Sequence, residues 1–90
     1  MTRETNIRQK IYEGETTEAI RLLKEWLIAE PENDEIYYLL GNAYRKEENF
    51  RDALNHYLKA IELNPDSPAR EAHDMLMKIM EFYNKDMFNH

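Results

Sequence analysis

Apolar residues recur at steps of three and four along most of the chain, a pattern that predicts amphipathic α-helices. The stripe is clear at Ala19, Leu23 and Trp26, and again at Ala53 and Tyr57. No stretch alternates apolar and polar residues over the length of a strand, so we expect no sheet. The pattern predicts five helices, at about residues 3–13, 16–30, 34–47, 50–63 and 68–84.

Proline and short polar residues mark the ends of these helices. Pro31 stops the second helix because it lacks an amide donor and clashes with the preceding turn. Asn33 is placed to cap the third helix and Asn49 the fourth, with Asp52 returning the bond as in a capping box. The pair Ser67-Pro68 is typical of a helix start, and we expect the last few residues of the chain to fray.

The sequence repeats at an interval of 34 residues. Pairs at this offset keep their chemical character, as do Glu18 with Asp52, Ala19 with Ala53, Ile20 with Leu54, Leu27 with Ile61 and Pro31 with Pro65. The pair Gly14 and Glu48 is an exception. A fixed period closed by proline indicates a helical repeat rather than two unrelated helices.

Residues 34–67 resemble one complete tetratricopeptide repeat (TPR) unit. The family pattern of aromatic, Leu-Gly, aromatic, Ala, aromatic, Ala and a closing Pro is filled by Tyr37, Leu40, Gly41, Tyr44, Ala53, Tyr57, Ala60 and Pro65. We expect the two helices of this unit to cross closely at Gly41 and Ala53. The resemblance implies an all-α fold, a right-handed superhelical stack of antiparallel helix pairs, similar to small stand-alone bacterial TPR proteins.

The rest of the chain resembles the family more loosely. Residues 2–33 resemble a degraded unit, with Ile7 and Ile11 where leucine and tyrosine belong, Arg8 in place of the glycine, and a turn one residue shorter. Residues 68–90 resemble the capping helix that closes such arrays. We therefore expect residues 1–90 to form a single TPR-like domain. One complete unit is fewer than the roughly three that stability normally requires, so the tail must supply core or the chain must self-associate.

The resemblance also implies a binding surface, because the first helix of each unit lines the concave wall of a TPR array. In the third helix we expect the core positions to be Tyr37, Leu40, Gly41 and Tyr44. The wall then carries Glu35, Tyr38, Asn42, Arg45 and Lys46.

Three of these wall residues have a clear chemical role in binding. Tyr38 would pack on a ligand, Asn42 would bond a peptide backbone through both its oxygen and its amide, and Arg45 would bind an acidic group. The alternative is that Asn42 serves the scaffold and Arg45 is a solvated charge. A carboxylate clamp of the chaperone type is not expected, because the first unit lacks its lysine.

The fifth helix holds four of the five methionines of the chain. Ala69, Ala72, Leu76, Ile79 and Tyr83 form a stripe that is predicted to pack on the third and fourth helices, with Met75 also facing inward. That arrangement turns His73, Met77 and Met80 toward the concave wall, where adaptable methionines suit binding. The alternatives are that the methionines fill gaps in the core, or that Phe82 and Phe88 make this helix the interface of a structural homodimer.

Composition and charge narrow the function. The chain is 42% apolar and 33% charged, carries a net charge of −6 and contains no cysteine, which argues against disorder, a disulfide scaffold and thiol chemistry. Without a basic cluster, binding to nucleic acid or to an anionic membrane is not expected. No apolar run reaches the roughly 20 residues that span a bilayer. The first residues lack a secretory signal, so we expect a cytoplasmic protein.

Catalytic and metal chemistry find little support in the sequence. His56 stands four residues after Asp52, but no second histidine joins them at ligand spacing, so no metal site is expected. No Gly-rich loop is present to hold a phosphate or cofactor. The expected function is therefore non-catalytic binding of a peptide or helical segment of a partner protein, without a cofactor.

Overall fold

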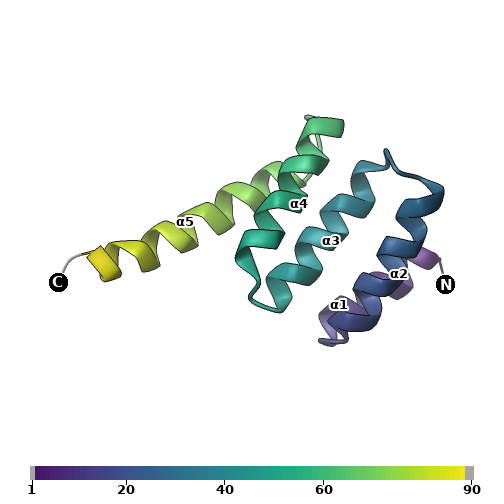
Figure 1. Ribbon diagram of the computed structural model, residues 1–90, viewed down its shortest axis with the longest axis horizontal. Helices are drawn as coiled ribbons and strands as arrows, with labels where there is room; N and C mark the ends of the chain where they lie inside the picture. The colour runs from purple at the N-terminus through teal and green to yellow at the C-terminus, as the bar shows by residue number, and fades with distance from the viewer. Residues whose placement is uncertain (1, 89–90) are drawn as a thin grey trace.

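Five α-helices make up the computed structural model, which describes the backbone of residues 2–88 and the side chains of residues 2–82. They are α1 (Arg3–Tyr12), α2 (Thr16–Ala29), α3 (Asp34–Lys46), α4 (Phe50–Leu63) and α5 (Ala69–Phe88) (Figure 1). The all-α prediction is confirmed, and the first four helices end within one residue of their expected bounds. The expected end of α5 near residue 84 is wrong, because no glycine or proline follows Pro68 to stop the helix before Phe88.

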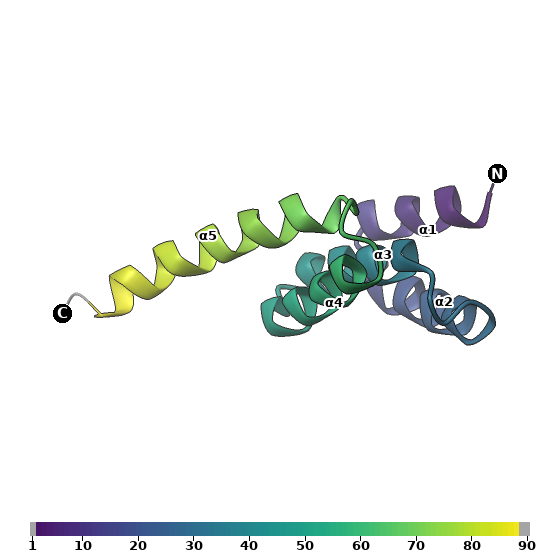
Figure 2. The same cartoon turned by 90° about the horizontal axis from the view of Figure 1, so that it is seen from above.

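The helices are stacked so that α3 lies at the centre. Figure 2 shows α1 and α5 on one side of the molecule and α2 and α4 on the other. Between them, α3 packs against α1, α2 and α4, while α5 packs against α4. The distal part of α5 projects beyond the body formed by the other helices (Figure 1).

This central position changes which residues of α3 form the core. Ile36, Leu39 and Ala43 are fully buried, whereas Tyr37 and Tyr44 are only half-buried. The predicted core stripe of α3 is therefore incomplete. It contained Leu40 but left out Ile36, Leu39 and Ala43, which belong with Leu40 to the core cluster shared with the first unit.

The close crossing of α3 and α4 is confirmed. A Cβ atom at Gly41 would lie 2.4 Å from two carbon atoms of the Tyr57 ring. The Tyr57 ring is fully buried, and so is Ala53. Glycine is needed at position 41 because the ring occupies the space that any side chain would take.

The turns after α1 and α3 have the same geometry. Gly14 and Glu48 both adopt positive φ, 85° and 64°, so the mismatched pair of the repeat shares one backbone conformation. The residue after each returns its amide to the preceding helix, Glu15 N to Lys10 O at 2.8 Å and Asn49 N to Tyr44 O at 2.9 Å.

The expectation of a shorter turn in the first unit is therefore wrong. The 34-residue offset continues through the turn into α1, so the residue that stands at the position of Gly41 is Ile7 rather than Arg8. Ile7 is 1% exposed and belongs to the core between the first unit and α3. Arg8 stands instead at the position of Asn42.

The predicted caps are confirmed at two of three helices. Asn33 Oδ1 accepts from the Glu35 amide at 3.0 Å, and Ser67 Oγ accepts from the Ala69 amide at 3.1 Å. The cap predicted at Asn49 is wrong, because this side chain donates to Asp52 Oδ2 at 2.7 Å and makes no capping bond to α4.

Candidate partner-binding groove

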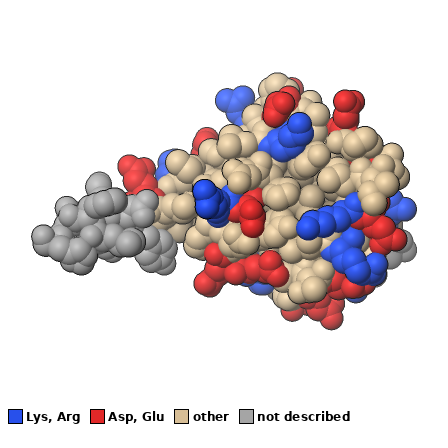
Figure 3. Space-filling model, in the orientation of Figure 1, with Lys and Arg blue, Asp and Glu red and all other residues tan. Residues whose placement is uncertain are grey.

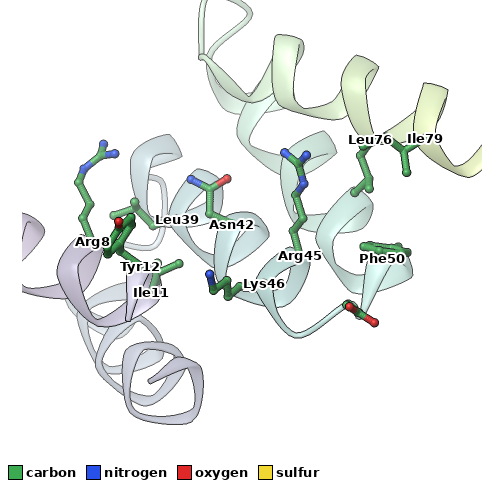
Figure 4. A pocket seen from close by; sticks show the side chains of 11 residues that line it. Arg8, Ile11, Tyr12, Leu39, Asn42, Arg45, Lys46, Phe50, Leu76 and Ile79 are labelled. Carbon is green, nitrogen blue, oxygen red and sulfur yellow. The ribbon is translucent and has the colours of Figure 1, made fainter. Parts of the chain in front are cut away.

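An open groove of about 590 Å³ lies between α1 and α5, with α3 at its base (Figure 4). The side chains that line it come from these three helices and from the start of α4 with the turn before it. They are Arg8, Ile11, Tyr12, Leu39, Asn42, Arg45, Lys46, Glu48, Phe50, Leu76 and Ile79.

The repeat brings equivalent positions together in this groove. Residues 34 apart line all three walls: Arg8 with Asn42 and Leu76, and Ile11 with Arg45 and Ile79. The sequence prediction placed Asn42, Arg45 and Lys46 on this surface but missed the counterparts in α1 and α5. Counting 34 residues back and forward from Asn42 and Arg45 finds these counterparts, once the first turn is given its observed length.

Asn42 is held from behind by Tyr57. The Tyr57 hydroxyl donates to Asn42 Oδ1 at 2.6 Å. Burial raises the pKa of this hydroxyl, against a smaller opposing effect of the Arg45 charge, so it stays protonated and remains a donor at neutral pH. The Asn42 oxygen thus already accepts one hydrogen bond, whereas its amide nitrogen donates to no other described residue and is open to the groove.

Arg45 and Lys46 place positive charge at the base of the groove. Neither forms an ion pair with another described residue. In Figure 4 the Arg45 guanidinium points toward the α5 side, near Leu76, and the Lys46 amine toward the α1 side, near Ile11. Glu48, in the turn after α3, is the carboxylate among the lining residues.

Arg8, the third basic residue of the groove, is neutralised locally. Its guanidinium lies 3.0 Å from Glu4 and 3.3 Å from Glu35, which links α1 to α3. Hydrogen bonds with Glu35 and Arg8 lower the pKa of Glu4, whereas the contact with Glu4 and partial burial raise the pKa of Glu35. Arg8 acts as a brace between the two units.

Tyr38 lies beside the groove rather than in it. Its ring centroid is 6.2 Å from that of Tyr57 and 5.9 Å from the guanidinium carbon of Arg8. The ring is half-buried and borders a smaller hollow that Ser67 and Pro68 also line. Tyr38 thus packs within the stack of helices.

The fifth helix turns a different side to the groove than the sequence predicted. Leu76 is fully buried and Ile79 half-buried, and both line the groove. Met75, expected in the core, is 56% exposed. Met77 is 47% exposed without lining the groove, and Met80 packs against the core cluster of α4 and α5.

His73, Met77 and Met80 therefore do not line the groove, contrary to expectation. The predicted inward positions Ala69 and Leu76 are buried as expected, but the groove lies along this same stripe, at Leu76 and Ile79, rather than along the side that carries His73 and Met77. Phe88 lies outside the side chains that the structure describes.

The opposite face of the molecule shows charges of both signs, dispersed over its surface (Figure 3). Figure 3 shows the side on which α2 and α4 lie in front, where acidic and basic side chains are scattered with uncharged surface between them. Within the described residues, no group of three or more acidic, histidine or cysteine side chains could hold a metal ion. None of the described helices has the length and apolar character to cross a membrane.

The stacked antiparallel helix pairs and the groove along their first helices define a helical-repeat protein. The family model of the tetratricopeptide repeat matches residues 35–67. The solution NMR structure of Bacteroides fragilis protein BF1650 is 51% identical, with a TM-score of 0.88 over 99% of this chain and 91% of that one. No match was found among curated proteins. The chain belongs to the tetratricopeptide repeat family, whose repeats are non-catalytic and mediate protein–protein interaction.

Proposed function

We propose that the groove between α1, α3 and α5 binds a peptide or helical segment of a partner protein. The observation that carries this proposal is the convergence of repeat-equivalent positions on one concave surface. Tyr12, Phe50 and Ile79 supply accessible apolar surface, and the base supplies a few polar groups, among them Asn42 and Arg45. Apolar area combined with a few oriented polar groups is the usual make-up of a recognition site.

A photo-crosslinking phenylalanine derivative placed at single positions tests which face the partner contacts. In the groove it would replace Tyr12, which is 79% exposed, and on α2 it would replace Ile28, which is 84% exposed. We expect the partner to crosslink to the derivative at position 12 and not at position 28. Equal crosslinking at both positions would show that the groove is not the binding site.

A pull-down with groove variants tests whether the groove side chains contribute to the affinity for the partner. The double variant Asn42→Ala/Arg45→Ala should capture less partner than wild type. Lys24→Ala/Arg51→Ala, on exposed positions of α2 and α4 outside the groove, should capture as much as wild type. Equal capture by the two double variants would contradict the proposal.

A structural homodimer through α5 is the second candidate. The projecting helix exposes Met75, Met77 and Phe82, the last to 66%, and adaptable apolar side chains of this kind suit an interface. Sedimentation at micromolar concentration tests this candidate. A dimer that Phe82→Glu dissociates would support it, and a monomer at every concentration would remove it.

A further inference from the structure

The polar base of the groove presents donors to a ligand. An asparagine side chain ordinarily offers both an acceptor and two donors. Here the Tyr57 hydroxyl takes one of the two lone pairs of the Asn42 oxygen while both amide N–H bonds stay open, so Asn42 is mainly a donor to a ligand. Arg45 and Lys46, the next polar residues along the same side of α3, are donors only. A segment that binds this base must therefore bring acceptors.

The charge of the base selects among acceptors. Arg45 and Lys46 have no ion-pair partner among the described residues, whereas Arg8 is already neutralised by Glu4 and Glu35. Hydrogen bonds to carboxylates are stronger than those to neutral carbonyls, because opposite charges assist them. A basic segment would instead bring like charge toward Arg45 and Lys46. Carboxylates are thus the ligand groups that the base favours most.

The spread of the two cations indicates where those carboxylates belong. Arg45 points toward the α5 wall and Lys46 toward the α1 wall, so the two cations diverge across the groove (Figure 4). A single terminal carboxylate would need cations that converge on one point. Diverging cations suit carboxylate side chains at separate positions along a segment.

We propose that the groove takes an acidic amphipathic segment, with apolar side chains against Tyr12, Phe50 and Ile79 and carboxylate side chains on Arg45 and Lys46. This inference rests on the proposed function and adds the chemistry of the partner. Tyr57 is a positioning residue in it, because its hydroxyl fixes which end of Asn42 the segment meets.

Selection from a library of random 16-residue peptides displayed on phage tests this chemistry while the partner itself is unidentified. Peptides selected on the wild-type protein should be enriched in Asp and Glu over the starting library. Synthetic copies should bind more weakly as salt rises, because exposed ion pairs are screened. Selected peptides without acidic enrichment, or a selection that yields no binders, would overturn the proposal.

Charge reversal locates the interaction. Arg45→Glu/Lys46→Glu should weaken binding of the selected peptides by at least about tenfold, since each reversal replaces attraction with repulsion. Lys24→Glu/Arg51→Glu changes the net charge by the same amount on exposed positions outside the groove, and it should leave the affinity near that of wild type. An equal loss in both variants would show that net charge, rather than the groove, attracts acidic peptides.

Removing one hydroxyl tests the orientation of Asn42. Tyr57→Phe keeps the ring but frees the Asn42 oxygen, and it should weaken binding by about two- to tenfold, the value of one hydrogen bond. Asn42→Asp replaces the donors with a carboxylate and should reduce binding further. If both variants bind as well as wild type, the assignment of Asn42 as an oriented donor is wrong.

The outcomes separate this inference from the proposed function. Neutral peptides that lose affinity with Tyr12→Ala or Ile79→Ala would keep the groove as the site and overturn the acidic preference alone. Peptides indifferent to every groove substitution would overturn both. A wild-type dimer that Arg45→Glu/Lys46→Glu dissociates would make a second copy of the chain the occupant, against the proposal of a separate partner.

Discussion

The two helix pairs of this protein share a turn and a repeat period but distribute their core volume differently. In α3–α4 one helix contributes Gly41 and the other Tyr57, whose ring fills the space beside the glycine. In α1–α2 the equivalent residues are Ile7 and Leu23, and both are buried. The second pair shares far more contact along its length than the first. The repeat thus fixes the positions at which two helices meet. The sizes of the two side chains at those positions set how closely the helices approach.

The same comparison explains the chemistry of the groove. Arg8 and Asn42 occupy equivalent positions on α1 and α3. The side chain of Arg8 is held by Glu4 and Glu35 and braces one pair against the other. Asn42 is held by Tyr57 from within its own pair, which leaves its amide for a ligand. One position therefore serves assembly in the first pair and is available for recognition in the second.

The largest effect is expected from emptying the first crossing. Ile7→Ala removes a fully buried side chain from the core cluster that it shares with Leu23, and the cavity left behind should destabilise the fold by roughly 2–5 kcal/mol. Urea unfolding followed by circular dichroism measures this. Ile28→Ala, at a position that is 84% exposed, is the control and should change stability by less than about 0.5 kcal/mol. Equal effects in the two variants would contradict the assignment of Ile7 to the core.

Filling the second crossing should destabilise for the opposite reason. Gly41→Ala places a methyl group 2.4 Å from the buried Tyr57 ring, which its bond to Asn42 keeps from moving freely, and it should cost roughly 1–3 kcal/mol. Adding Tyr57→Leu removes the clash, so the double variant should lose less stability than the sum of the single variants. Thermal melting of all three tests this. Additive losses would mean that residues 41 and 57 do not compete for the same space.

Helix caps give a smaller contrast that recurs in both pairs. The first helix of each pair has a side-chain cap, from Thr2 and Asn33, and the second helix has none. Asn33→Ala should therefore cost about 1 kcal/mol. Asn49→Ala, which removes a residue without a capping bond, should cost less than about 0.5 kcal/mol. Chemical denaturation measures both losses of stability. A loss for Asn49→Ala as large as that for Asn33→Ala would show that Asn49 does cap its helix.

The smallest effect concerns protonation where the two pairs meet. The pKa of Glu35 is raised, so its contribution to stability is present at low pH and lost as pH rises through its folded-state pKa. The pKa of Glu4 is lowered, so its contribution has the opposite sign and is lost on acidification. The two contributions offset each other in the wild type.

Removing the Glu35 carboxyl group should change how stability depends on pH. In Glu35→Gln the contribution that is lost with rising pH is removed, while Arg8 still lowers the pKa of Glu4, so the variant should gain stability relative to wild type as pH rises from about 3 to about 6. Urea midpoints across this range provide the measurement. A loss of relative stability over the same interval would show that the sign is wrong.

The features that the sequence predicted correctly depend on residues close to one another in the chain. The helix bounds follow from the apolar stripe and the prolines, and the caps at Asn33 and Ser67 follow from bonds to amides two residues ahead. The crossing at Gly41 was predictable because the two helices that cross there belong to the same repeat unit. The base of the groove followed in turn, since Asn42, Arg45 and Lys46 lie on the same helix as that glycine.

Tertiary structure decided the rest, because those features depend on the rotation of one helix against another. The alignment of α1 with α3 depended on the turn after each helix, where Gly14 and Glu48 both adopt a left-handed backbone conformation. The residue types at these two positions do not reveal that the turns are alike. The side of α5 that lines the groove was set by Ala69 and Leu76 packing on α4, which turned Met77 and Met80 away. The donor character of Asn42 arose from a hydroxyl fifteen residues along the chain. Amphipathic periodicity fixes that a helix has a buried side, but only the neighbour against which it packs determines where that side points.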